Sequence, residues 1–163
     1  MPHSEELELE LEENLKFLKF KIENEVFVTP MDKLICISKP VSVREIPMST
    51  KYILGMTTFR GQLSVLVDVG KKFALKKHAS DEIDCFIYVN TSSGRMCVPV
   101  SQVLGVVSFT KKDIKHNFAK PKSIPEEFIT GAIDNSDEVL MILDLEKCLD
   151  EKELSTMKKA FAS

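Results

Sequence analysis

Residues 55–73 of the chain read GMTTFRGQLSVLVDVGKKF, and residues 131–149 read GAIDNSDEVLMILDLEKCL. The two stretches align without a gap, and each reads as a glycine, a turn, an apolar strand, an aspartate and a lysine. The matched pairs are Gly55 with Gly131, Leu63 with Val139, Val65 with Met141, Val67 with Leu143, Asp68 with Asp144 and Lys71 with Lys147. Because a repeat indicates that one supersecondary unit is used more than once, two copies in 163 residues predict two similar subdomains.

Composition places the chain among soluble globular proteins, with 44% apolar and 29% charged residues. The net charge of −3 argues against nucleic-acid binding, which needs a clustered positive field. Residues 1–13 are acidic, whereas a secretory signal begins positive and becomes apolar. No apolar run approaches the ~20 residues that span a bilayer. We therefore expect a cytoplasmic protein.

Alternating apolar and polar residues predict strands along most of the chain. Residues 15–30 read as a hairpin, and the same pattern continues into the first repeat copy. A short helix and a linker are expected over 71–84, where charged residues interrupt the alternation. Residues 84–90 and 95–110 then read as two strands joined by a small polar loop. The chain is therefore predicted to be mainly β.

The last part of the chain favours an amphipathic helix over 145–161, because apolar residues recur there at helical spacing. Short strands, glycine-containing turns and the repeat together predict two small antiparallel barrels, each closing to remove its edges. One face of the repeated strand would be apolar in each barrel. These faces consist of Leu63, Val65, Val67 and Val69 in the first barrel and of Val139, Met141, Leu143 and Leu145 in the second.

The sequence offers no recognisable catalytic arrangement. The three histidines lie in a tail, a linker and a connection, away from any motif. Asp68 and Asp144 could form an acid–base pair, but each follows a strand and precedes a helix, where an aspartate typically caps backbone N–H groups. The four cysteines lack the spacing of zinc or redox sites and read as reduced core residues. We predict a noncatalytic interaction domain without metal or cofactor.

Arg60 stands apart in the segment TTFRGQL, between an aromatic residue and a glycine and before the most apolar strand of the chain. Guanidinium groups favour planar contacts with several acceptors at once. Arg60 therefore either satisfies carbonyl groups near its own turn or presents a fixed cation at a partner surface. The residues alone leave both interpretations open.

Residues 52–73, YILGMTTFRGQLSVLVDVGKKF, resemble the signature of the CheW-like family of chemotaxis coupling proteins. Residues 128–149, FITGAIDNSDEVLMILDLEKCL, resemble the closing element of that family, a glycine turn followed by a strand and the start of a leucine-rich helix. The resemblance covers nearly the whole chain. It predicts an acidic extension over 1–13, a CheW-like domain of two intertwined barrel subdomains over 14–150, and a C-terminal helix over 145–161 packed on that domain.

The fold implied by the resemblance is a pair of five-stranded, SH3-like barrels side by side. The implied function is that of a noncatalytic adaptor in an array under the inner membrane. It would hold the cytoplasmic tip of a methyl-accepting chemoreceptor together with the regulatory domain of the histidine kinase CheA, and other CheW-like domains would be further partners in array rings. The receptor's helical hairpin would lie in an apolar groove between the barrels.

The resemblance also assigns residues to the two partners. The receptor set consists of Met31, Leu34, Cys36, Arg60 and Cys85, and the kinase pair, on a strand turn of the first barrel, consists of Val41 and Val43. From the residues themselves, the apolar members of both groups could equally be core.

The sequence departs from the family pattern at several positions. Val65 replaces a strand proline, Cys36 a common acidic residue and Ser101 an aspartate, and TTFRG replaces the family's NLRG turn. Such changes are typical of a divergent or accessory paralogue, so a scaffold of a non-flagellar pathway, with pili or another output, is the alternative. A small barrel that binds nucleic acid or a ligand is a further hypothesis, but it needs a basic, aromatic platform, and the chain has no Trp and only two Tyr.

Overall fold

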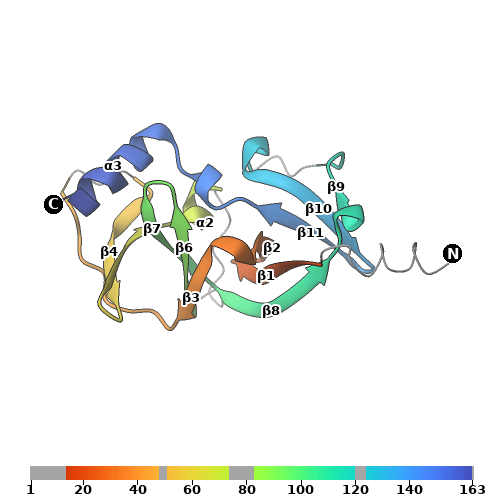
Figure 1. Ribbon diagram of the computed structural model, residues 1–163, viewed down its shortest axis with the longest axis horizontal. Helices are drawn as coiled ribbons and strands as arrows, with labels where there is room; N and C mark the ends of the chain where they lie inside the picture. The colour runs from red at the N-terminus through yellow and green to blue at the C-terminus, as the bar shows by residue number, and fades with distance from the viewer. Residues whose placement is uncertain (1–13, 48–50, 74–82, 120–123, 163) are drawn as a thin grey trace, which may run out of the picture.

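A computed structural model describes residues 14–47, 51–73, 83–119 and 124–162. The predicted acidic extension and most of the predicted linker after the first repeat copy lie outside these ranges. Two sheets, side by side along the long axis, form two lobes (Figure 1). Lobe A holds a six-stranded sheet and lobe B a five-stranded sheet. The mainly β, two-lobed prediction is confirmed.

Lobe A is built from both ends of the described chain, and lobe B from the middle. The strand order in lobe A is β8-β1-β2-β11-β10-β9, with β1 Leu15–Ile22, β2 Glu25–Pro30, β8 Gln102–Phe109, β9 Ile114–Lys115, β10 Ile129–Asn135 and β11 Glu138–Leu143. The order in lobe B is β3-β6-β7-β5-β4, with β3 Leu34–Ser38, β4 Ile53–Phe59, β5 Gln62–Val67, β6 Cys85–Thr91 and β7 Gly94–Val100. The lobes are therefore intertwined by the chain.

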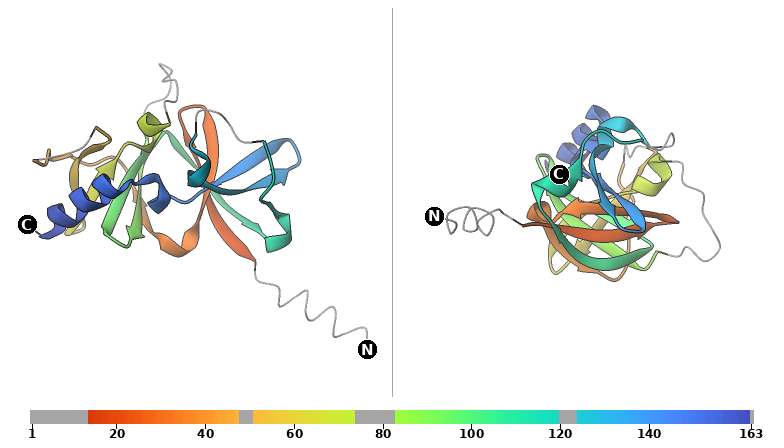
Figure 2. Two further views of the ribbon diagram at one scale, coloured as in Figure 1. Left: turned by 90° about the horizontal axis from the view of Figure 1, so that it is seen from above. Right: turned by 90° about the vertical axis from the view of Figure 1, so that its right-hand side faces the viewer.

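The helical elements are short, apart from the last one. They are η1 Met31–Lys33, α2 Val69–Lys72, η2 Lys111–Asp113, η3 Glu126–Phe128, η4 Glu146–Cys148 and α3 Glu151–Ala162. α3 lies along the outside of lobe B (Figures 1 and 2). Its first turn carries a reciprocal cap, in which the Asp150 carboxylate accepts from the Glu153 amide at 2.8 Å and the Glu153 carboxylate accepts from the Asp150 amide at 2.9 Å. This cap explains why the C-terminal helix begins at Glu151, whereas residues 146–148 form a separate turn.

Closure and strand count differ from the expected pair of closed five-stranded barrels. In the described part of the chain each sheet keeps two edge strands, and lobe A has a sixth strand, the two-residue β9. The corresponding position in lobe B is a single bridge between Arg44 and Met56. Pro40 and Pro47 flank this segment, and because proline has no backbone N–H, they limit further strand pairing there.

The two repeat copies are β4-β5-α2 in lobe B and β10-β11-η4 in lobe A, offset by 76 residues. In both copies the second strand of the hairpin pairs in parallel with a strand from another hairpin: β5 with β7, and β11 with β2. The predicted caps are confirmed. Asp68 accepts from the Lys71 amide at 3.0 Å, and Asp144 accepts from the Glu146 amide at 3.1 Å.

The sequence predicted that the repeated glycines lie at turns. They lie instead inside β4 and β10, where the strand register shifts. A Cβ atom on Gly55 would lie 2.2 Å from the carbonyl oxygen of Arg44, and one on Gly131 would lie 2.7 Å from a side-chain carbon of Ile114. Glycine thus allows a crossing segment to approach the hairpin in each lobe. The first hairpin's actual turn is Arg60–Gly61, with φ values of +52° and +76°, as in a type I′ turn.

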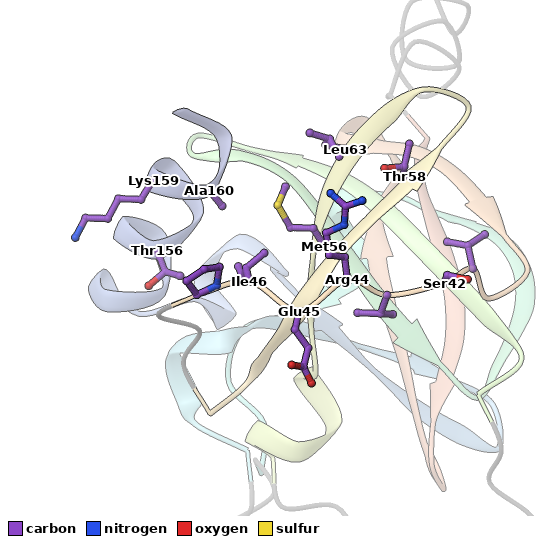
Figure 3. Close-up of a pocket in the computed structure, with 13 residues that line it drawn as sticks. Ser42, Arg44, Glu45, Ile46, Met56, Thr58, Leu63, Thr156, Lys159 and Ala160 are labelled. Carbon is purple, nitrogen blue, oxygen red and sulfur yellow. The ribbon is translucent and has the colours of Figure 1, made fainter. Parts of the chain in front are cut away.

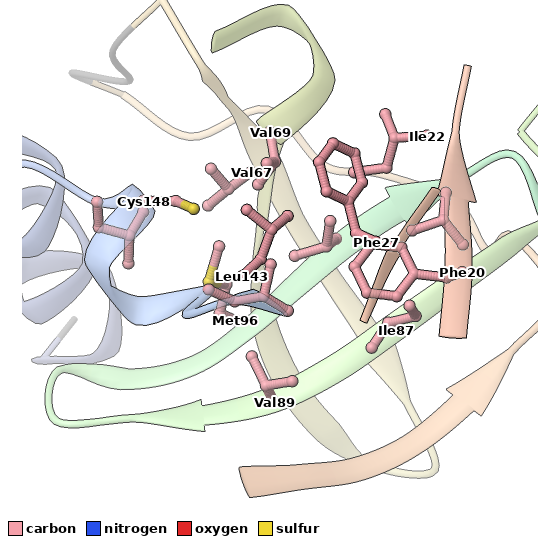
Figure 4. Packing of buried hydrophobic residues seen from close by; sticks show 14 of the residues in the cluster. Phe20, Ile22, Phe27, Val67, Val69, Ile87, Val89, Met96, Leu143 and Cys148 are labelled. Atoms are coloured by element: carbon pink, nitrogen blue, oxygen red, sulfur yellow. The ribbon is translucent and has the colours of Figure 1, made fainter. Parts of the chain in front are cut away.

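Three hydrophobic clusters hold the fold together. The central cluster lies between the lobes and draws on both sheets, with Phe20, Phe27, Val67, Ile87, Met96 and Leu143 among its fully buried members (Figure 4). The lobe A cluster consists of Phe17, Val28, Ile133, Leu140 and Ile142, and the lobe B cluster consists of Leu66, Phe86, Tyr88 and Cys97. β5 is covered on both faces, so consecutive residues of it are buried rather than alternate ones.

Two of the residues predicted to line the barrels point outward. Leu63 is 49% exposed and its repeat equivalent Val139 is 56% exposed. The prediction was wrong because both residues lie near the hairpin ends, outside the part of the strand that pairs with its neighbour in the sheet: β5 pairs with β7 only at Val65 and Leu66, and β11 pairs with β2 only at Met141 and Ile142. The other six predicted residues are buried.

The predicted single strand over 95–110 is two strands in different sheets. The chain leaves lobe B after β7 and enters lobe A as β8, with Ser101 at the crossing. The Ser101 amide donates to the carbonyl oxygen of Lys21 at 2.8 Å, and its hydroxyl accepts from the Glu23 amide at 2.8 Å. These bonds fix the crossing against the β1–β2 turn.

Candidate partner-binding surfaces

Three members of the receptor set lie at the seam between the lobes. Met31, Leu34 and Cys85 are half-buried and pack against the central cluster. Leu34 in β3 pairs with Val89 in β6, and Cys85 is the first residue of β6. Cys85 and Val89 are four residues apart, which is about 13 Å along the strand at ~3.3 Å per residue. The seam therefore presents these side chains along an extended line, which suits an elongated partner better than a compact ligand.

Cys36 lies on the other face of β3 from Leu34. The register shifts between the two residues, so Cys36 packs against the lobe B cluster, opposite Tyr88. The Tyr88 ring stacks on Phe59 with centroids 5.4 Å apart, and the Arg60 guanidinium lies 5.0 Å from the Phe59 ring centroid. The structure thus groups Cys36 with Arg60, through two aromatic rings, and separates both from the seam.

The Arg60 guanidinium has one contact in the described part of the chain, the cation–π contact with Phe59. It accounts for none of the hydrogen bonds to carbonyl groups found there, so the interpretation as a turn-satisfying arginine has no support from these residues. Its left-handed backbone and exposed side chain place a cation at the tip of the β4–β5 hairpin.

The kinase pair lies in a hollow of about 880 Å³ on the outside of lobe B, here named the lobe B hollow (Figure 3). Val43 is 41% exposed. The wall comes from three elements: the segment before β4, the β4–β5 hairpin and α3. Its residues are Val41, Ser42, Val43, Arg44, Glu45, Ile46, Pro47, Met56, Thr58, Leu63, Thr156, Lys159 and Ala160.

The α3 wall of the lobe B hollow is fixed by a buried ion pair. The Lys72 ammonium donates to the Glu153 carboxylate and to the carbonyl oxygen of Cys148, with side chains 9% and 1% exposed for Lys72 and Glu153. Lys72 and Cys148 are repeat equivalents, so the two copies touch each other at this point. At the other end of α3, the Phe161 ring lies where a Cβ atom on Gly94 would be, 2.2 Å from its nearest carbon.

A second hollow of about 500 Å³ lies in lobe A. Met31 of the receptor set lines it, and His116 at its edge forms a hydrogen bond with the carbonyl oxygen of Thr130 at 3.1 Å. The remaining lining residues are Asn14, Leu15, Lys16, Phe17, Pro30, Asp32, Ile114 and Ile142.

Two cysteine thiols and one carboxylate are among the groups whose pKa values are shifted. Burial raises the pKa of the Cys97 thiol and of the Cys148 thiol to about 12. Hydrogen bonds from Ser92, followed by the Lys33 ammonium, lower the pKa of Glu146 to about 2. All four cysteines are free thiols. Across the described ranges, His, Cys, Asp and Glu side chains nowhere gather in a group of three that could hold a metal ion.

Several residues of the lobe B hollow escaped the sequence reasoning. Met56 and Leu63 read as an ordinary strand pattern, and Arg44 lies in a segment without a motif. The repeat carried one usable signal, since Gly55 marks where another segment comes close, but the sequence does not show which segment.

No helix in the described ranges is both long and apolar enough to span a membrane.

The structure is that of a two-lobed β protein with a half-buried apolar seam between the lobes and a partly apolar hollow in each lobe. Residues 16–153 match the family model described as CheW-like domain. The chain therefore belongs to the CheW-like family, as the sequence predicted.

Relatives match along most of their length. A chemotaxis protein CheW from Treponema pallidum is 21% identical over 150 residues, covering 90% of this chain and 88% of the relative. A chemotaxis protein CheW from Klebsiella aerogenes is 26% identical over 140 residues, covering 86% and 84%. The crystal structure of the scaffolding protein TtCheW from Thermoanaerobacter tengcongensis superposes with a TM-score of 0.76 at 21% identity, covering 86% of this chain and 97% of that one. The last comparison supports the fold.

Proposed function

We propose that this protein is a noncatalytic adaptor of the cytoplasm, which couples a chemoreceptor to the regulatory domain of the histidine kinase CheA. The observation that carries the proposal is the family match over residues 16–153. Two curated relatives named as chemotaxis protein CheW align over more than four fifths of their own length. The adaptor would use residues 14–150 as its binding domain, with the C-terminal helix, which begins at Glu151 and not at the predicted residue 145, packed against it and residues 1–13 as an extension.

The receptor site in this proposal is the seam between the lobes. Met31, Leu34 and Cys85 offer half-buried apolar surface along it, which fits the apolar face of a helix. Cys36 and Arg60, which lie beside the lobe B cluster, form a second contact with the receptor, in which Arg60 supplies a positive charge.

The kinase site in this proposal is the lobe B hollow. Val41 and Val43 lie in its wall, and a hollow of about 880 Å³ with exposed apolar side chains accepts protruding side chains from a protein partner. The seam residues Met31, Leu34 and Cys85 are not among the residues that line the lobe B hollow, so we expect both partners to bind together, although Arg60 lies at the tip of the hairpin that also forms one wall of the hollow. The changes at Val65, Cys36 and Ser101 favour a divergent scaffold, and a non-flagellar pathway is the alternative setting for the same function.

The two sites can be tested separately by placing a carboxylate in each. Val43→Asp should weaken binding of the kinase regulatory domain by at least about tenfold and leave binding of a receptor signalling fragment unchanged. Leu34→Asp should have the opposite pattern. Val139→Asp is the matched control, because Val139 is an equally exposed valine outside the lobe B hollow. Isothermal titration calorimetry measures each affinity, and equal losses in all three variants would contradict the assignment of sites.

A further inference from the structure

In each lobe, a short segment pairs with the first strand of the repeated hairpin: the segment around Arg44 in lobe B and β9 in lobe A. Arg44 bridges to Met56 on β4, with backbone hydrogen bonds of 2.8 and 2.7 Å. Lys115 in β9 pairs with Ala132 on β10, and Ala132 is the repeat equivalent of Met56 at the offset of 76 residues. Arg44 and Lys115 are therefore structural counterparts, each a cation held against its hairpin at the place where the repeated glycine allows close approach.

The counterparts differ in how their charge is balanced. Lys115 forms an ion pair with Asp134, with a nitrogen–oxygen distance of 3.5 Å. The repeat equivalent of Asp134 is Thr58, which cannot supply a negative charge. Among the residues that the structure describes, no carboxylate forms an ion pair with Arg44. Lobe A thus balances internally a charge that lobe B leaves open.

The open charge lies in the lobe B hollow. Figure 3 shows the Arg44 side chain beside Met56 and Thr58, with Leu63 at the rim, while the neighbouring Glu45 points away. A partner that fills this apolar hollow excludes water from around the guanidinium. Because electrostatic attraction strengthens as water is removed, a carboxylate from the partner is the group that best compensates the guanidinium for its lost hydration. An arginine can bind that carboxylate with two parallel hydrogen bonds.

We propose that Arg44 is the position in the lobe B hollow that recognises the partner, and that the partner segment presents an Asp or Glu beside an apolar side chain. This inference rests on the proposed binding of the kinase regulatory domain at the hollow and adds the chemistry of recognition. Thr58 contributes to this recognition, because the absence of a carboxylate at this position leaves the Arg44 guanidinium free to bind a carboxylate of the partner.

The test uses three variants of the full chain, titrated with the kinase regulatory domain at low and at high salt. Arg44→Met should weaken binding about tenfold or more at low salt, which is about 1.4 kcal/mol, and reduce the salt dependence. Thr58→Asp copies lobe A and gives Arg44 an internal partner, so it should weaken binding while leaving the arginine in place. Asp134→Thr, the matched control in lobe A, should bind as the unmodified chain does.

The outcomes separate this inference from the function on which it rests. Failure of the unmodified, folded chain to bind the kinase domain overturns both. Normal binding with unchanged affinity and salt dependence in Arg44→Met and Thr58→Asp overturns the Arg44 inference alone. Loss of receptor-fragment binding instead of kinase-domain binding in these variants also overturns it, because the hollow would then serve the other partner.

Discussion

Lys72→Met tests how strongly the buried ion pair fixes α3 and thereby one wall of the lobe B hollow. The Glu153 side chain is 1% exposed, and its second oxygen has no hydrogen-bond partner among the described residues. Removing the Lys72 ammonium leaves a buried carboxylate without its counter-charge. Loss of one member of a buried pair costs about 3–5 kcal/mol. For a chain of this length, each kcal/mol lowers Tm by about 2–4 °C, so we expect a decrease of roughly 6–20 °C.

Urea unfolding followed by circular dichroism measures this loss, with unchanged m-values as the check on a common mechanism. Adding Glu153→Gln to Lys72→Met should restore about 1–3 kcal/mol, because the neutral amide keeps its cap on Asp150 without a buried charge. Lys33→Met is the control. It removes an exposed pair with Glu146 at 3.1 Å and should cost at most about 1 kcal/mol. If Lys72→Met costs no more than this control, the reasoning about α3 is refuted.

Three further predictions concern backbone and titratable groups. Gly55→Ala should cost about 1–3 kcal/mol more than Gly61→Ala in thermal unfolding, because a Cβ atom meets a carbonyl oxygen at 2.2 Å only at the first position, and equal costs would count against the close approach. Cys97 should resist thiol reagents at pH 8, and since folding raises its pKa to about 12, its contribution to stability should be lost as pH rises from about 9 toward 12; rapid labelling of the folded protein contradicts this. The pKa of Glu146 is lowered to about 2, chiefly by Ser92, so its contribution is present above pH 4.5 and is lost as pH falls toward 2. Glu146→Gln should therefore flatten acid unfolding in that interval, and an unchanged profile would exclude the role.

Much of the fold follows from local sequence signals. The repeat predicted two similar lobes, and the aspartates after each repeated strand predicted the caps, because a cap depends on residues only two or three positions away. The first hairpin also follows from its alternation of apolar and polar residues. In the caps and in the first hairpin, the interacting groups are close in the sequence.

Features that depend on distant segments could not be read in this way. Gly55 is needed because Arg44 crosses behind it, and no local pattern shows that crossing. Leu63 belongs to an apolar strand but is exposed, and it lies outside the part of β5 that pairs with β7. The register shift in β3 separates Leu34 from Cys36, although residues two apart in a regular strand share a face. Tertiary contacts decided each case.

The candidate surfaces also include features that the sequence indicates and features that depend on distant segments. The resemblance supplied the receptor set and the kinase pair, and the structure groups Met31, Leu34 and Cys85 at the seam. The open charge of Arg44 has no local sequence signal, because the ion pair that balances its counterpart Lys115 joins two strands, through Asp134.

The proposed adaptor function requires one chain to bind receptor and kinase at once. The most direct measurement is size-exclusion chromatography of the full chain with a receptor signalling fragment and the kinase regulatory domain, singly and together. We expect two binary complexes and one ternary complex that contains all three components. A folded chain that binds neither partner, or that binds each only in the absence of the other, contradicts it.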